Sequence, residues 1–284
     1  MAFGTLDARL QVVAEKALAF CKNRYGGNGL KIEQGIDAQI KWLPTFYLRP
    51  TRFLILAVEV DDNLFPEALR GAALEITQYD CPISVFQVCP LSTYQADPKQ
   101  GKVNLLRKHG FGIITVDDDG TVTLQHPCGP LAQHISAEEL EPSLAELTPK
   151  LKVEFKRAHE TYLANVGQGI QQVGQIVEGL ITCLAEHAKK KNLISSTEAS
   201  GALADTIDAL YSKPAFKAHR AALGAARDFI KEYRNIASHP QKTAQQAMIK
   251  IQKCKAGFLR GVDVAGKLRA AMQQLGYSIK IHIT

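Results

Sequence analysis

The chain has 284 residues, of which 46% are hydrophobic and 22% charged, and its formal net charge at pH 7 is +6. This apolar fraction is too high for an intrinsically disordered protein, and no apolar run approaches the ~20 residues that a membrane span needs. No basic segment with an apolar run and a cleavage site marks the N-terminus for secretion. Six scattered cysteines without a C-x-x-C pair argue against a zinc site or a disulfide framework. We therefore expect a two-domain cytoplasmic protein that has no membrane partner.

Helical and strand-like segments alternate over the first half of the chain. Helices are expected at 5–24, 66–79 and 99–109, and strands at 36–42, 52–60, 83–89, 111–117 and 121–127. The last two strands are joined across Asp118-Asp119-Gly120, which predicts a hairpin turn. The alternation predicts an α/β domain with a mixed sheet over residues 1–145.

The second half of the chain has an almost wholly helical pattern. Helices are expected at 151–190, 201–211, 215–236 and 241–275, and a short strand at 277–284. Four helices with short connections predict an all-α up-and-down bundle over residues 150–284. The fold class expected for the whole chain is therefore α+β, in two domains.

The charge is divided unevenly between these halves. Residues 1–150 hold 14 Lys or Arg against 18 Asp or Glu, whereas residues 151–284 hold 20 against 10. A basic helical domain can bind a polyanion such as RNA, or can simply expose solvated lysines. The charge split alone leaves both interpretations open.

The most specific motif lies near the end of the third helix of the predicted bundle, where the sequence reads EYRNIASHP. Arg234, Asn235 and His239 fall within six residues of this segment. An arginine can hold a phosphate through two parallel hydrogen bonds and stabilise developing negative charge, while a histidine can move a proton near neutral pH. Together these side chains can promote attack of a ribose 2′-hydroxyl on its own phosphorus without a metal ion.

The segment RNIASH resembles the R-x4-H signature of the HEPN superfamily, and the surrounding pattern of long helices over 151–275 is similar as well. The resemblance implies a metal-independent endoribonuclease that needs no cofactor, with Arg234, Asn235 and His239 as catalytic residues. It implies Glu232 and Tyr233 as supporting residues, RNA as substrate and a homodimer formed through the bundle. Antiviral defence or a toxin–antitoxin pair is the setting that the family implies.

Other interpretations of this motif stay open. Arg-Asn at a helix end can cap carbonyl groups, and Ser-His-Pro can form the turn before the next helix. A HEPN-like bundle can also be non-catalytic and act as an adaptor that binds nucleic acid or a partner protein.

The order of elements over 10–135 resembles the restriction-endonuclease-like, or PD-(D/E)XK, fold. That resemblance implies a magnesium site formed by Glu15, Asp37 and Glu59. The sequence departs from the family pattern at Asp61, which stands where the family has lysine. Asp61 can join a carboxylate cluster for Mg²⁺, or the acidic run can be a solvated turn before a helix.

We expect this N-terminal domain to be a degenerate nuclease-like domain that regulates the helical one, in response to a protein or a ligand. The alternative is a magnesium-dependent DNA nuclease that uses the N-terminal carboxylates, with the bundle serving only to dimerise.

Overall fold

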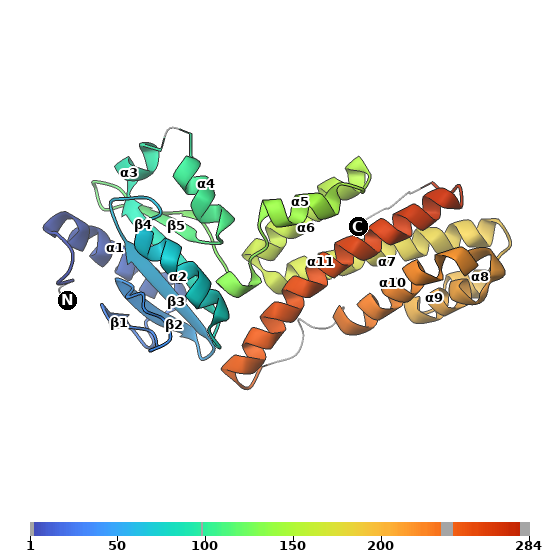
Figure 1. Cartoon of the computed structure of the whole chain (residues 1–284), viewed down its shortest axis with the longest axis horizontal. Helices are drawn as coiled ribbons and strands as arrows, with labels where there is room; N and C mark the ends of the chain where they lie inside the picture. Colours follow the sequence, from blue (N-terminus) through green and yellow to red (C-terminus); the bar gives the residue numbers. More distant parts are fainter. Residues whose placement is uncertain (1–2, 98, 234–240, 279–284) are drawn as a thin grey trace. The chain divides into compact units, whose positions relative to one another are not determined.

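The computed structural model describes residues 3–97, 99–233 and 241–278. The fold is α+β, with a six-stranded mixed sheet followed by a helical region. The chain divides into two compact units, which are coloured by sequence in Figure 1. The first comprises residues 1–137 with 240–252, and the second comprises 138–239 with 253–284.

The first unit is built on a sheet whose strands follow one another in sequence order. Its strands are β1 (Lys31–Ile32), β2 (Phe46–Thr51), β3 (Leu54–Val60), β4 (Ile83–Pro90), β5 (Gly112–Val116) and β6 (Val122–His126). Strands β3, β4 and β5 run parallel, and the other neighbouring pairs are antiparallel. The mixed sheet and the β5–β6 hairpin predicted from the sequence are thus confirmed.

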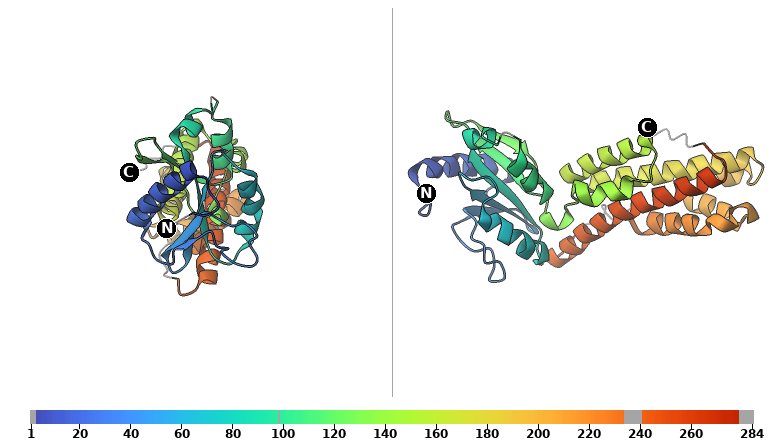
Figure 2. Two further views of the ribbon diagram at one scale, coloured as in Figure 1. Left: turned by 90° about the vertical axis from the view of Figure 1, so that its left-hand side faces the viewer. Right: turned by 45° about the horizontal axis from the view of Figure 1, so that its top comes forward.

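Helices cover both faces of this sheet, as the two views of Figure 2 show. The helices of the unit are α1 (Ala8–Tyr25), α2 (Glu67–Gln78), α3 (Leu91–Gln95), α4 (Gly101–Lys108) and the 3-10 turn η1 (Leu131–Gln133). Alternate residues of β3 point to opposite faces, so Leu56 and Val58 join the core under α1. Ile55 and Ala57 join the other core, under α2 and α4. The unit is a three-layer sandwich with two separate cores.

The strand expected at 36–42 is not present, because this segment is an irregular loop between β1 and β2. Asp37 accepts a hydrogen bond from the Gln39 amide, and the Ile40 amide bonds back to the Asp37 carbonyl, which closes a turn. The segment resembles a strand in sequence because it contains the apolar residues Ile36, Ile40 and Trp42, which are buried in the structure. The strand that pairs with β3 is instead β2, which was not among the strands expected from the sequence.

The second unit is helical. Its helices are α5 (Ala137–Leu144), α6 (Pro149–Ala164), α7 (Val166–Lys190), α8 (Ser196–Ala199), α9 (Leu203–Ser212), the 3-10 helix η2 (Pro214–His219), α10 (Arg220–Tyr233) and most of α11 (Ala244–Gln274). The strand expected at 277–284 falls mainly on residues outside those that the structure describes.

The predicted helix 151–190 is in fact two helices, α6 and α7, which are separated at Asn165. The backbone of Asn165 is extended, and its side chain accepts a hydrogen bond from the Gln168 amide, so it caps the start of α7. The two helices approach closely at this junction, because a Cβ on Gly169 would lie 2.4 Å from the Tyr162 Cα. A single capping residue therefore breaks a helix that the apolar periodicity predicts to be continuous.

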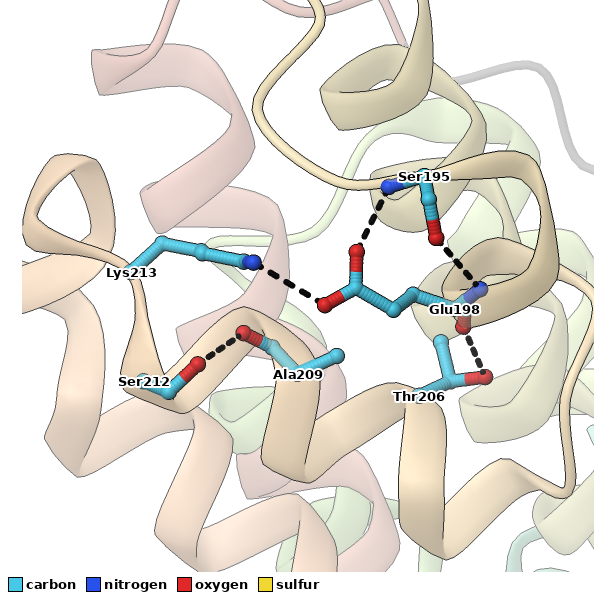
Figure 3. A network of polar contacts seen from close by, with 6 residues as sticks. All are labelled: Ser195, Glu198, Thr206, Ala209, Ser212 and Lys213. Carbon is cyan, nitrogen blue, oxygen red and sulfur yellow. Dashed lines mark hydrogen bonds and ion pairs between the residues drawn. The ribbon is translucent and has the colours of Figure 1, made fainter.

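A polar network fixes the short helix α8 against α9, as Figure 3 shows. Ser195 and Glu198 form a reciprocal capping box at the start of α8, and Lys213 pairs with Glu198 at 2.9 Å. Thr206 donates a hydrogen bond from its side chain to the Glu198 carbonyl. The hydrogen bond from the Ser195 amide, followed by that from Lys213, lowers the pKa of Glu198 to about 2.

We predict that Gly169→Ala lowers the free energy of unfolding of the helical unit by about 1–3 kcal/mol, because the new methyl group meets the Tyr162 backbone. Gly174 is the matched control, since it lies in α7 with nothing within 4 Å of an added Cβ. Gly174→Ala should stabilise the unit by about 0.5–1 kcal/mol through helix propensity. Urea unfolding followed by circular dichroism at 222 nm measures both, and equal effects would contradict the close approach.

Candidate functional site at the end of helix α10

The three predicted catalytic residues, Arg234, Asn235 and His239, lie outside the residues that the structure describes. The structure does describe the helices before and after them. Helix α10 ends at Tyr233, directly before Arg234 in the sequence, and α11 begins at Ala244. The geometry of the candidate site is therefore that of these two helices and of the supporting residues Glu232 and Tyr233.

The last turn of α10 is fixed against α11 by two aromatic rings one turn apart. Phe229 and Tyr233 stack with their ring centroids 5.7 Å apart. A Cβ on Gly257 of α11 would lie 2.6 Å from the Tyr233 ring, and a Cβ on Gly261 would lie 3.1 Å from the Phe229 ring. Two glycines one turn apart thus let α11 receive the aromatic face of α10, which holds Tyr233 in place.

Gly261 also brings a third helix to this crossing. A Cβ at this position would lie only 2.1 Å from the Val173 side chain of α7. Phe229 is 1% exposed and Val173 is fully buried, so the crossing of α7, α10 and α11 belongs to the core of the unit. The residues that precede the motif are therefore attached to a packed core.

A hollow of about 570 Å³ opens between α10 and α11 beside this crossing. We call it the α10–α11 hollow, and it is lined by Asp228, Phe229, Glu232, Tyr233, Ala256, Leu259, Arg260 and Asp263. Asp228 and Glu232 are four residues apart on α10, so they share one face of the helix. Both supporting residues named from the sequence line this hollow.

Polar contacts organise the lining of the α10–α11 hollow. Arg260 pairs with the Asp263 carboxylate at 3.2 Å, and Lys267 binds the same oxygen at 2.9 Å. Burial, together with the negative charge of Glu232 and a hydrogen bond to it, raises the pKa of the Tyr233 hydroxyl. Tyr233 therefore stays protonated at neutral pH and donates to Glu232.

Of the four carboxylates predicted as magnesium ligands, Glu59 and Asp61 lie together at the end of β3, whereas Glu15 and Asp37 lie elsewhere in the first unit. Glu15 is exposed on α1, which covers one face of the sheet, whereas Glu59 projects from the opposite face with Ile55 and Ala57. Asp37 accepts a hydrogen bond from the Tyr79 hydroxyl at 3.2 Å, and Asp61 caps the Asn63 amide at 2.7 Å. Among the described residues, no group of three or more His, Cys, Asp or Glu is arranged to hold a metal ion.

Glu59 has a specific hydrogen-bond partner that is not evident from the sequence. Its carboxylate accepts a hydrogen bond of 2.9 Å from the Trp42 indole. Burial is the largest influence on this carboxyl and, opposed in part by the indole, raises the pKa of Glu59 to about 7. Glu59 thus anchors the loop between β1 and β2 to the sheet, and no short-range sequence pattern links residues 17 positions apart.

Comparisons with known proteins give no relative for this chain: no family model, no curated protein and no solved structure matches it. None of the described helices is both long and apolar enough to cross a membrane.

We predict that Gly257→Ala displaces the Tyr233 ring and lowers the free energy of unfolding of the helical unit by about 1–3 kcal/mol. Gly224 of α10 is the matched control, because an added Cβ meets nothing within 4 Å there. Gly224→Ala should stabilise the unit by about 0.5–1 kcal/mol. Thermal unfolding followed by circular dichroism tests the pair, and a stable Gly257→Ala variant would contradict the packing of α10 on α11.

A second prediction concerns Glu59, whose pKa in the folded protein, about 7, lies above its ordinary value. The folded state then binds more protons than the unfolded state between pH ~4.5 and ~7, so stability falls as pH rises through this range. Glu59→Gln should remove this loss, and its stability relative to wild type should improve by about 2–3 kcal/mol between pH 5 and pH 8.

Urea unfolding followed by Trp42 fluorescence measures this effect in the first unit, because Trp42 is the only tryptophan of the chain. Glu67→Gln, which removes an exposed carboxyl from the same unit, is the matched control. A pH dependence of Glu59→Gln that equals that of wild type would contradict the assignment.

Proposed function

We propose that the helical unit is a metal-independent endoribonuclease, with Arg234, Asn235 and His239 as its catalytic residues. The observation that supports this proposal best is the packing of Tyr233, the residue before Arg234, into the wall of the α10–α11 hollow. Catalytic groups need a rigid support, and the core at the end of α10 offers one to the start of the motif.

The proposed reaction is an internal transesterification. The ribose 2′-hydroxyl attacks the adjacent phosphorus, and the bond to the 5′-oxygen of the next nucleotide breaks. His239 accepts the proton of the 2′-hydroxyl, and the 5′-oxygen leaves with a proton from solvent. Arg234 stabilises the negative charge that develops on the phosphoryl oxygens, and Asn235 orients these groups. The products carry a 2′,3′-cyclic phosphate and a 5′-hydroxyl, and no step requires a metal ion.

The charge of the second half of the chain supports RNA as the substrate. This half holds 20 Lys or Arg against 10 Asp or Glu, and this excess of cations attracts a polyanion. The attraction weakens as the salt concentration rises. Residues 1–150, which include most of the first unit, hold 14 against 18 and have no such excess. We propose that the first unit regulates the helical unit and is not itself the nuclease, in keeping with the separation of Glu15 from Glu59 by the sheet.

We expect wild type to cleave single-stranded RNA in the presence of EDTA and to leave 2′,3′-cyclic phosphate ends. Arg234→Ala/His239→Ala should lower the rate at least ~10³-fold, because it removes both the charge stabilisation and the proton transfer. The measurement is gel analysis of labelled RNA and DNA strands, with end groups identified by phosphatase and kinase treatment.

Arg227→Ala/His219→Ala is the matched control, since it removes one arginine and one histidine from the same unit away from the motif. This control should retain the wild-type rate. If cleavage needs Mg²⁺ and is retained in Arg234→Ala/His239→Ala, the nuclease activity belongs to the first unit and the proposal is wrong. If the protein binds RNA in a salt-sensitive manner but cleaves it under no condition, the helical unit is an adaptor and not a nuclease.

A further inference from the structure

The α10–α11 hollow differs in charge from the basic half of the chain in which it lies. Its lining carries three carboxylates, on Asp228, Glu232 and Asp263, against the single guanidinium of Arg260. Arg260 and Lys267 neutralise Asp263, and Glu232 accepts from the Tyr233 hydroxyl. In the part of the chain that the structure describes, no ion pair or hydrogen bond joins the Asp228 carboxylate. Asp228 therefore offers both oxygens to a ligand.

The ligand that fits this hollow is a group with hydrogen-bond donors and a flat apolar surface. A phosphate would be repelled by Asp228 and Glu232, and it has no donor to offer them. The partly exposed ring of Tyr233, together with Ala256 and Leu259, supplies the apolar part of the wall, while Phe229 is buried. Unpaired RNA bases combine a flat ring with donors on the base edge, and proteins bind them by aromatic contact and by hydrogen bonds to that edge.

We propose, as an inference that rests on the proposed function, that the α10–α11 hollow binds a guanine base of the RNA beside the phosphodiester that is cut. The Asp228 carboxylate accepts two hydrogen bonds, from N1–H and from the exocyclic N2 amine of the guanine. The base edge is directed to Asp228 because the Glu232 carboxylate is already engaged by the Tyr233 hydroxyl. The volume of about 570 Å³ lies within the ~300–1,000 Å³ range of small-ligand sites.

Guanine is selected because it alone has two neighbouring donors on its Watson–Crick edge. A carboxylate is an acceptor at both oxygens, so it matches two donors side by side. Adenine and cytosine present one donor next to an acceptor nitrogen, and uracil presents one donor between two carbonyls. Each of these bases would place an acceptor against a carboxylate oxygen, which costs binding free energy.

The position of the hollow also links recognition to cleavage. Tyr233 lines the hollow and Arg234 is the next residue, so a base held there lies near the start of the motif along the chain. A base bound on this rigid wall would fix the position of its own ribose and phosphate. Asp228 would therefore act in substrate selection and not in the chemical step.

The test measures binding of the full chain to decamers of 2′-O-methyl RNA, whose blocked 2′-hydroxyl prevents cleavage by the proposed reaction. The probes are oligouridylate and three variants with one central G, A or C, and fluorescence anisotropy gives their affinities in EDTA. Wild type should bind the G probe about tenfold more tightly than the others. Asp228→Asn should reduce this preference to about twofold or less, because an amide replaces one acceptor oxygen with a donor.

Asp205→Asn is the matched control, because it removes an exposed carboxylate from α9 of the same unit, and it should keep the preference of wild type. Equal binding of the four probes by wild type, or a guanine preference that persists in Asp228→Asn, would overturn the proposal. A basic protein segment as the true occupant would give the first of these results. If wild type prefers guanine but cuts no RNA, the guanine site is supported and the nuclease is rejected. If wild type cuts RNA but binds the four probes equally, the nuclease is supported and the guanine site is rejected.

Discussion

Close backbone approach at three glycines is the constraint on which the helical unit depends. Gly169 brings α7 onto the last turn of α6, while Gly257 and Gly261 bring α11 onto α10 and α7. At each position a methyl group would overlap a neighbouring residue, in one case a backbone atom that cannot rotate away. The helix propensity lost at these glycines, about 1 kcal/mol each, is exchanged for packing of large side chains such as Phe229 and Tyr162. The position of Tyr233, the residue before Arg234 in the sequence, follows from this packing.

The sequence predicts the elements whose signal is local. Helices α1, α2, α4, α9 and α11 and strands β3, β4, β5 and β6 appear within a few residues of their expected bounds, because their apolar periodicity and turn residues are read over a few positions. The prediction is wrong where one side chain overrides the pattern. Asp37 closes a turn within an apolar stretch that looks like a strand, and Asn165 caps a new helix within a continuous helical pattern. Whether Asp37 or Asn165 interrupts the pattern depends on which hydrogen bond its side chain makes, and the apolar periodicity does not show this.

The candidate site likewise has one part that the sequence identifies and one part that only the fold brings together. Arg234, Asn235 and His239 are close in the sequence, so a linear motif identifies them without any fold. The α10–α11 hollow joins Asp228 to residues about thirty positions away, such as Arg260, and depends on glycines that carry no chemical signal of their own. Glu59 was named as a metal ligand through the resemblance to the restriction-endonuclease-like fold, but its pKa is controlled by burial and by Trp42, which only the folded sheet brings to it. The surroundings of Asp228 and of Glu59 are therefore both formed by residues distant in the sequence.

Opposite charge requirements would explain why an acidic hollow is formed by the helix that directly precedes the proposed catalytic motif in the sequence. In the proposed ribonuclease, cations distributed over the helical half would attract RNA from a distance but would not distinguish one base from another. Carboxylates have the opposite effect. They repel the phosphate backbone of RNA and bind favourably only to a base edge that presents hydrogen-bond donors. If both kinds of group lined one surface evenly, each would cancel the other. Under the proposal, two uncompensated carboxylates confined to the α10–α11 hollow, within a half that carries an excess of cations, would let general attraction and base selection act on different parts of the same strand.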